Sequence, residues 1–260
     1  MKTYKQHYLE CKELYDNNEA SVYDLTIVKN SLEFDIFNFN DLRKKISGRF
    51  ENGLDCIEDE WSIKLNKWND IPELENFCAQ VMPQIEEKVF GCHLKVEHIH
   101  PYKNKTNASQ ESSWAWHYDD CPKEYIKMAI YLNDVSEANG CMQVILGPEG
   151  TIPVVDTYRL DPTAIKGFPP PVFPKTRIPN DVVENILDND GRIYNLVGKM
   201  ATHFIFTPNV MHKGTIPTDN NSAREAIFFF LRPSMKKTQN YISDAKPFAP
   251  EQNVKKYELD

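Results

Sequence analysis

The 260-residue chain lacks the features that mark secreted and membrane proteins. Its first twenty residues contain no apolar run of the kind found in secretory signal peptides. No stretch approaches the roughly 18 consecutive apolar residues that are needed to span a bilayer. Six cysteines are scattered without a Cys-x-x-Cys pair, which is typical of reduced, buried thiols. We therefore expect a cytoplasmic protein with no membrane partner.

The sequence also lacks an excess of positive charge. Its 38 acidic residues outnumber its 30 basic residues, which gives a formal net charge of −8 at pH 7. Proteins that bind nucleic acids usually carry a basic surface that neutralises phosphate groups. The acidic balance argues against a nucleic-acid partner and favours a small-molecule substrate. It predicts no particular oligomeric state.

Glycine is scarce, with 10 residues against 17 prolines. Eight of the prolines lie between Pro148 and Pro179, inside a stretch (148–198) that interrupts a series of predicted strands. Insertions of this length in a compact domain are usually functional, often as a lid or a substrate loop. A rigid surface decoration is the alternative interpretation.

The order of local patterns predicts a mainly β protein with flanking helices. Residues 1–93 indicate mostly helix and loop, and the clearest helix is expected over 73–91, kinked at Pro83 and ended by Gly91. From residue 94 the chain contains short apolar runs rich in β-branched and aromatic residues. They are HLKVEHI, IKMAIYLND, CMQVILG, MATHFIF and REAIFFFL. The dipeptide Asn139-Gly140 predicts a hairpin between the second and the third of them.

Because these strands are short and lack intervening helices, they predict an antiparallel sandwich or jelly roll. We expect one domain over 1–260. It would comprise a mostly helical part (1–93), a jelly-roll core (94–235) that carries the Pro-rich insertion (148–198), and a C-terminal tail (236–260).

The segment SSWAWHYDD contains a candidate metal-binding pair, His117 and Asp119. In an extended strand, residues two apart point to the same face, so both side chains can reach one ion. An imidazole and a carboxylate suit Fe(II), especially when a second histidine completes the set. Taken alone, a His-x-Asp tripeptide is common by chance, and a surface histidine beside two acids is the simpler interpretation.

His212, in FTPNVMHKG, is the favoured third ligand. It follows the predicted strand MATHFIF through a Pro-Asn turn, which can direct a side chain back toward the mouth of a barrel. His203 competes, but it lies inside a strand, where a histidine usually has a structural role. His98 and His100 also compete, but they precede the strand pair and bring no carboxylate with them.

Arg224 opens the strand REAIFFFL and is the fourth element of the candidate site. On this strand it shares a face with Ala226, Phe228 and Phe230, and the opposite face is also apolar. An arginine at the mouth of a buried strand needs a partner. A planar guanidinium can bind a carboxylate through two hydrogen bonds, which suits a dicarboxylic acid. The alternative is an ion pair with Asp219 or a nearby glutamate.

Three blocks, WHYDD, LNDVSEANGCMQVILGPEG and HKGTIPTDNNSAREAIFFF, resemble the phytanoyl-CoA dioxygenase family of Fe(II)/2-oxoglutarate oxygenases. The resemblance covers about residues 94–235. The middle block keeps the Asn-Gly-Cys turn at 139–141 but ends in GPEG at 147–150, where the family has Pro-Gly-Ser-His. The resemblance implies a double-stranded β-helix (a cupin-like jelly roll) and the hydroxylation of a substrate, with release of succinate and CO2.

The resemblance also implies roles for single residues. His117, Asp119 and His212 would hold Fe(II), leaving positions for 2-oxoglutarate and O2, and Arg224 would bind the far carboxylate of the co-substrate. A further polar contact to 2-oxoglutarate is expected from one of three candidates, which are Tyr102, Lys127 and Tyr131. Two tryptophans, Trp114 and Trp116, are candidates for the substrate pocket, although ordinary packing explains each of them equally well.

Family members that halogenate lack the carboxylate ligand, so Asp119 favours hydroxylation. Two alternatives stay open. One is a cupin-like jelly roll that binds zinc or nickel without oxygenase activity, and Arg224 argues against it. The other is a peptidyl hydroxylase of the same fold, in which a lysine usually stands in place of Arg224.

Overall fold

The computed structural model describes residues 3–16, 19–25, 27–60, 62–106, 112–119, 121–147, 177–208, 210–218 and 223–247. The α-helices in these ranges are α1 (Tyr4–Glu13), α2 (Ile36–Asn52), α3 (Pro72–Ile85) and α4 (Asn180–Asp188). Most of the Pro-rich stretch (148–176) and the end of the predicted tail (248–260) lie outside the described residues. Within the described ranges, none of the helices has the length and apolar character that crossing a membrane requires.

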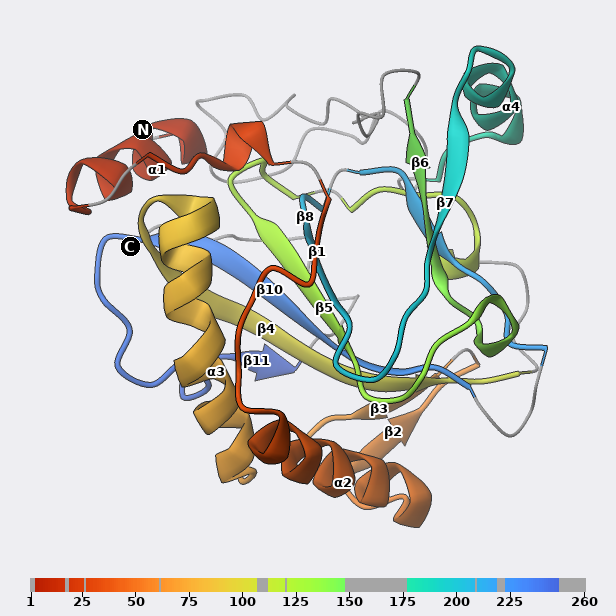
Figure 1. Cartoon of the computed structure of the whole chain (residues 1–260), viewed down its shortest axis with the longest axis horizontal. Coiled ribbons are helices and arrows are strands. Elements are labelled where there is room, and N and C mark those ends of the chain that lie inside the picture. Colours follow the sequence, from red (N-terminus) through yellow and green to blue (C-terminus); the bar gives the residue numbers. More distant parts are fainter. Residues whose placement is uncertain are drawn as a thin grey trace.

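The larger of two β-sheets follows the order β1-β8-β5-β10-β4-β3-β2, and β11 pairs with β4 beside this path. Its strands are β1 (Val28–Lys29), β2 (Cys56–Glu58), β3 (Ser62–Leu65), β4 (His93–Asn104), β5 (Ile126–Tyr131), β8 (His203–Phe206), β10 (Glu225–Ser234) and β11 (Lys246–Pro247). All pairings are antiparallel except that of β11, which runs parallel to β4. The long β4–β10 pair forms the centre of this sheet (Figure 1).

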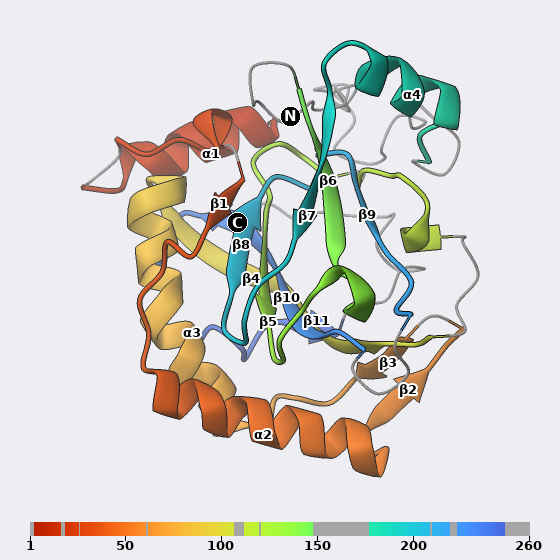
Figure 2. The same cartoon turned by 45° about the vertical axis from the view of Figure 1, so that its right-hand side comes forward.

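The smaller sheet has the order β7-β6-β9, with β6 (Met142–Leu146), β7 (Arg192–Leu196) and β9 (His212–Gly214). It faces the larger sheet (Figure 2). Side chains from both sheets form one apolar core between them, such as Tyr131 and Phe204 from the larger sheet with Val144 and Leu196 from the smaller. The two facing sheets make up the jelly roll that the sequence predicts.

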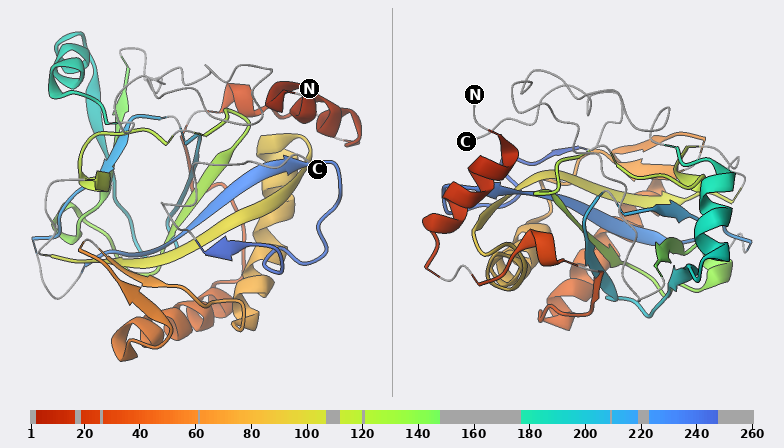
Figure 3. Two further views of the ribbon diagram at one scale, coloured as in Figure 1. Left: turned by 180° about the vertical axis from the view of Figure 1, so that it is seen from behind. Right: turned by 90° about the horizontal axis from the view of Figure 1, so that it is seen from above.

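Helices α2 and α3 cover the outer face of the larger sheet, on the side opposite to the smaller sheet (Figure 3). The alternation of β10 explains this arrangement. Ile227 and Phe229 point to the core that contains the helices, whereas Phe228 and Phe230 point to the core between the sheets. Both faces of β10 are therefore buried, as its apolar sequence indicates.

The helix expected over 73–91 is present as α3, which continues into one π-helical turn, η2 (Glu86–Phe90). Gly91 ends it in a left-handed conformation with φ of 61°, as predicted. Pro83 is accommodated inside α3.

The hairpin predicted at Asn139-Gly140 is wrong. Asn139 ends a short 3₁₀ turn, η4 (Glu137–Asn139), and Gly140 follows with φ of 82°. The strands on either side of it, β5 and β6, belong to different sheets. The turn carries the chain across the jelly roll from one sheet to the other, a change of partner that local sequence does not encode.

All five apolar runs identified in the sequence form strands, but the sequence did not predict the shorter and more polar strands. The predominantly helical part before residue 94 contributes β1, β2 and β3 to the larger sheet. The stretch assigned to the insertion ends in α4 and β7, and β7 is a strand of the smaller sheet. Three of its five residues, Arg192, Ile193 and Tyr194, are exposed, so β7 gives no run of buried apolar residues in the sequence.

Candidate metal centre and co-substrate site

The His-x-Asp segment extends the smaller sheet beyond β9. The backbone N–H of His117 donates to the carbonyl of His212 at 2.9 Å, and the N–H of His212 donates back at 2.8 Å. The N–H of Asp119 donates to the carbonyl of Pro208 at 2.9 Å. The main chain therefore places the two histidines directly opposite each other, with Asp119 two residues further along the same segment.

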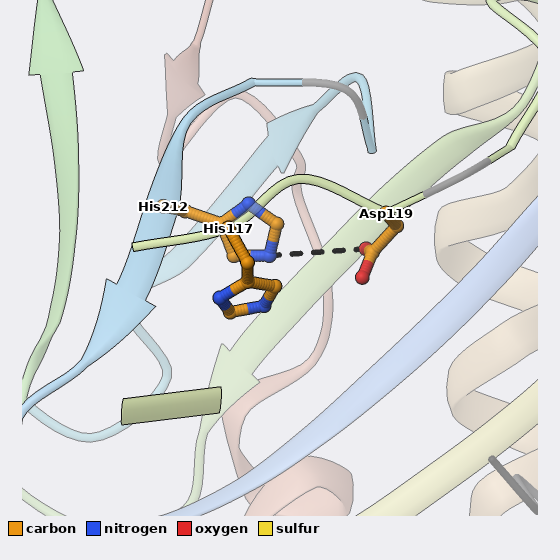
Figure 4. A group of neighbouring side chains, drawn as sticks. All are labelled: His117, Asp119 and His212. Atoms are coloured by element: carbon orange, nitrogen blue, oxygen red, sulfur yellow. Dashed lines mark ion pairs between the residues drawn. The ribbon is translucent and has the colours of Figure 1, made fainter. Parts of the chain in front are cut away.

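The three predicted ligands converge on one point (Figure 4). Their potential ligand atoms all lie within 4.8 Å of one another. The two imidazole rings have their centroids 4.2 Å apart, and Nε2 of His212 is 3.8 Å from Oδ2 of Asp119. Two histidines and one carboxylate gathered around one point are the ligand set of non-haem Fe(II) sites.

Backbone carbonyls fix which nitrogen of each ring faces this point. Nδ1 of His117 lies 2.9 Å from the carbonyl oxygen of Ala115, and Nδ1 of His212 lies 2.7 Å from that of Val210. A carbonyl oxygen can only accept, so Nδ1 carries the proton in both rings and Nε2 keeps its lone pair. Metal-binding histidines are oriented in this way. The residues present thus fit a divalent ion.

The charge state of the cluster suits the same ion. Burial lowers the pKa of His117 well below its usual range and that of His212 to about 4. Burial alone would raise the pKa of Asp119, but the positive charge of Lys127, together with the two histidines, outweighs it and lowers this pKa to about 2. At neutral pH the cluster therefore presents two neutral imidazoles and one carboxylate.

Arg224 lies immediately before β10 and is only 4% exposed. Its guanidinium carbon is 5.4 Å from the centre of the Tyr102 ring. Within the part of the chain that the structure describes, its Nε and Nη1 atoms are buried and have no hydrogen-bond partner. The alternative partner Asp219 lies outside the described residues. Buried donors of this kind are rare in folded proteins unless a ligand completes them.

One cavity of about 170 Å³ joins the candidate metal centre to Arg224. The three candidate metal ligands line it, and so do Arg224, Tyr102 and Lys127. Lys127 forms an ion pair with Asp119. Of the three residues predicted as a further co-substrate contact, Tyr102 and Lys127 therefore lie at the cavity. The hydroxyl of the third, Tyr131, donates to the carbonyl of Leu196 at 2.5 Å, and Tyr131 is not among the residues that line the cavity.

The two candidate tryptophans occupy different surroundings. Trp114 lines the cavity, where its ring lies against the backbone of Gly214. A Cβ atom added at Gly214 would be 2.6 Å from Cζ3 of Trp114, so only glycine leaves room for the ring. Trp116 packs in a small cluster with Tyr118 and Ile178 and is not among the residues that line the cavity.

The competing histidines do not belong to the cluster of potential ligand atoms that the triad forms. Nε2 of His203 accepts a hydrogen bond from the backbone N–H of Leu32 at 3.0 Å, which is the structural role expected for it. His100 lines the cavity and stacks on Tyr102 with a centroid distance of 5.1 Å. Burial first, and then the nearby lysines, lower the pKa of His100 to about 3.

One wall of the cavity comes from β3 and was not predicted from the sequence. Ser62 and Lys64 line the cavity from this strand, together with Asp59 just before it. Oδ2 of Asp59 lies 2.5 Å from Nζ of Lys64, and Lys64 pairs across the sheet with Tyr102. The alternation of polar and apolar residues in SIKL was the available signal, but four residues are too few to predict a strand.

Comparison with known proteins places this fold. No protein-family model matches the sequence. The chain is 22% identical over 201 residues to L-proline trans-4-hydroxylase from Streptomyces griseoviridis, which covers 70% of this chain and 72% of that protein. It superposes on EctD from S. alaskensis with 2-oxoglutarate and 5-hydroxyectoine with a TM-score of 0.55 at 14% identity, covering 96% of this chain and 86% of that one.

A second similar structure is HygX from Streptomyces hygroscopicus with nickel, 2-oxoglutarate and hygromycin B bound. Its TM-score is 0.51 at 13% identity, and the match covers 87% of this chain and 94% of that one. The shared fold belongs to the class of cupin-like jelly rolls, as the sequence predicts. Both of these solved structures hold 2-oxoglutarate, so proteins that bind this molecule adopt the same fold, in agreement with the resemblance seen in the sequence blocks.

Proposed function

We propose that this chain is an Fe(II)- and 2-oxoglutarate-dependent dioxygenase that hydroxylates a small molecule. One observation carries this proposal. A cluster of two histidines and one carboxylate lines the same cavity as a buried guanidinium that has two unpaired donors in the described part of the chain. The cluster suits iron, and the guanidinium suits a carboxylate.

His117, Asp119 and His212 would hold Fe(II) through two Nε2 atoms and one carboxylate oxygen. Together with bound Fe(II), 2-oxoglutarate and O2 convert a substrate C–H bond to C–OH while 2-oxoglutarate becomes succinate and CO2. Arg224 would bind the far carboxylate of 2-oxoglutarate and so fix the direction in which the co-substrate lies. Phe228 and Phe230 line the same cavity and would exclude water from it.

Arg224 also supports an oxygenase over a cupin-like protein that only binds a metal. A bound ion is completed by its ligands and gives no reason to bury a cationic side chain without an anion. Unpaired charged donors inside a protein are unfavourable, so their presence indicates a ligand that pairs with them. A dicarboxylic co-substrate is such a ligand.

A small-molecule substrate is supported by the acidic net charge and by the relatives. The names of the similar proteins refer to L-proline, 5-hydroxyectoine and hygromycin B, which are all small molecules.

Anaerobic titration tests the proposal. Addition of Fe(II) and 2-oxoglutarate to the metal-free protein should produce a visible charge-transfer band that neither component gives alone. Asp119→Ala should weaken Fe(II) binding and so reduce the band at limiting Fe(II). Asp134→Ala is the matched control, because the Asp134 side chain is exposed and pairs with Lys199 away from the cavity. A folded protein that binds Fe(II) but gives no band with 2-oxoglutarate would contradict the proposal.

The substrate can then be sought by succinate release. The protein would be incubated in air with Fe(II), 2-oxoglutarate and a panel that includes free amino acids, cyclic zwitterions and aminoglycosides. We expect one class to raise succinate release well above the uncoupled background. Stoichiometric formation of a product heavier by one oxygen atom would identify the reaction as hydroxylation.

A further inference from the structure

Lys127 is a buried cation that lines the cavity. Its side chain is 8% exposed, and it projects from β5 between its cross-strand neighbours Phe206 on β8 and Phe230 on β10. The ammonium lies 4.8 Å from the ring centre of Phe230 and 5.4 Å from that of Phe228. The faces of aromatic rings attract a cation, but a buried charge is still unfavourable unless an opposite charge lies beside it.

That partner is Asp119, one of the three candidate metal ligands. One oxygen of this carboxylate, Oδ2, contacts the Lys127 ammonium and lies 3.8 Å from Nε2 of His212. The ion pair restricts rotation of the Asp119 side chain and so holds the carboxylate beside the candidate ligand His212. The ammonium and a metal ion would nevertheless share one negative charge.

The charges that line the cavity show the consequence. Among the residues that line the cavity, Lys127 and Arg224 contribute two positive charges and Asp119 one negative charge, while Lys64 is balanced by Asp59. Arg177 is not part of this lining, although its charge also acts on Asp119. A divalent ion would raise the balance from +1 to +3, because 2 − 1 + 2 = 3. Repulsion between like charges is strong at short range in a buried site. The dianion of 2-oxoglutarate would return the balance to +1.

We propose that Lys127 is a positioning residue that pairs with Asp119 in the metal-free protein and couples metal binding to the co-substrate. This inference rests on the proposed function. The ammonium holds the carboxylate in place and stabilises the metal-free site, and it weakens the binding of a metal ion that arrives alone. 2-Oxoglutarate then strengthens metal binding, and by thermodynamic linkage the metal strengthens the binding of 2-oxoglutarate equally.

The test is the dissociation constant of Mn(II), measured with and without saturating 2-oxoglutarate by the electron paramagnetic resonance signal of the free ion. The ratio of the two constants is the coupling factor. Lys127→Met should bind Mn(II) at least tenfold more tightly than the wild type without 2-oxoglutarate, and its coupling factor should fall at least tenfold. Lys127→Arg keeps the charge and should keep most of the coupling.

One further variant controls for the loss of charge, and another replaces Lys127→Met if needed. Lys213→Met removes the same charge beside the ligand His212, but the Lys213 ammonium lies over the Trp116 ring, 4.8 Å from its centre, and should leave the coupling factor unchanged. Lys127→Gln replaces Lys127→Met if the latter does not fold. The metal-free Lys127→Met protein should also melt at a lower temperature, because Asp119 loses its partner, and Mn(II) should restore more of that loss than it adds to the wild type.

The possible outcomes separate the two proposals. An unchanged coupling factor in both neutral variants overturns the role of Lys127 and leaves the proposed function intact. A loss of 2-oxoglutarate affinity at unchanged Mn(II) affinity also overturns it, because Lys127 would then contact the co-substrate directly. A wild-type protein that binds neither Mn(II) nor 2-oxoglutarate overturns both.

Discussion

Substitution of two buried arginines by Met should have opposite effects on stability and on 2-oxoglutarate affinity. Arg224 lies immediately before β10 and Arg232 lies eight positions further along, within the strand, and they are 4% and 5% exposed. Nε of Arg232 donates to Oε2 of Glu97 at 2.9 Å. Arg224 has two unpaired buried donors in the described part of the chain. Replacement of each by Met keeps the bulk and removes the charge.

Arg224→Met should weaken 2-oxoglutarate binding without destabilising the metal-free fold. Two charge-assisted hydrogen bonds at about 1.5–3 kcal/mol each amount to roughly 3–6 kcal/mol. At about 1.4 kcal/mol per tenfold change, the dissociation constant should rise roughly 10²- to 10⁴-fold. An unpaired buried donor costs about 1–3 kcal/mol, so its removal should offset the lost contact with Tyr102 and leave the free energy of unfolding unchanged or raised by about 1 kcal/mol.

Arg232→Met should destabilise the metal-free fold and leave 2-oxoglutarate binding nearly unchanged. Removal of one partner of a buried ion pair costs about 3–5 kcal/mol, because Glu97 keeps its charge without compensation. The affinity for 2-oxoglutarate should stay within a factor of about two, since Arg232 is not among the residues that line the cavity.

Both quantities can be measured on the same samples. Urea unfolding of the metal-free proteins gives the stability, and calorimetric titration of 2-oxoglutarate into the Mn(II)-loaded proteins gives the affinity. If Arg224→Met loses as much stability as Arg232→Met, its guanidinium is paired within the protein and the co-substrate anchor lies elsewhere. Unchanged 2-oxoglutarate affinity in Arg224→Met would refute the same reasoning.

Other features give three further predictions. Gly214→Ala should displace the Trp114 ring at a cost of about 1–3 kcal/mol, visible as a change in tryptophan fluorescence and a weaker 2-oxoglutarate affinity, and an unchanged spectrum would count against the contact. Burial lowers the pKa of His203, whose Nε2 accepts a hydrogen bond from the backbone N–H of Leu32. As the pH falls below about 6.5, His203 therefore takes up a proton in the unfolded chain before it does so in the folded protein. Stability should therefore decrease on acidification by at most about 1.4 kcal/mol per pH unit from this group, and His203→Gln should reduce that slope in urea unfolding at several pH values. Trp116→Leu should lower the melting temperature but preserve Mn(II) and 2-oxoglutarate affinities, whereas altered affinities would place Trp116 at the site.

The sequence predicts the fold well where strands are long and buried on both faces. β10 is recognised from its continuous apolar run, and the alternation along it places Arg224 on the same face as Phe228 and Phe230. Short strands such as β3 and β9 are stabilised by their neighbours rather than by their own composition, so local patterns do not reveal them. The hairpin error at Gly140 has the same origin, because the choice of partner strand is a long-range property.

Part of the candidate metal centre could be predicted because it depends on local spacing. His117 and Asp119 are two residues apart, so the spacing in an extended segment already places both side chains on one face. Selecting His212 over its three competitors, His203, His98 and His100, also required the turn that precedes it and the family resemblance. The ion pair of Lys127 with Asp119 could not be foreseen, because it joins β5 to a segment in the opposite sheet.

The direct pairing of His117 with His212 has a consequence for design. The separation of these two positions is set by reciprocal main-chain hydrogen bonds, which do not depend on the identity of either side chain. A thiolate or carboxylate introduced at one position would start from the same backbone point as the imidazole it replaces. The ion that this centre prefers can therefore be changed independently of the scaffold that carries it.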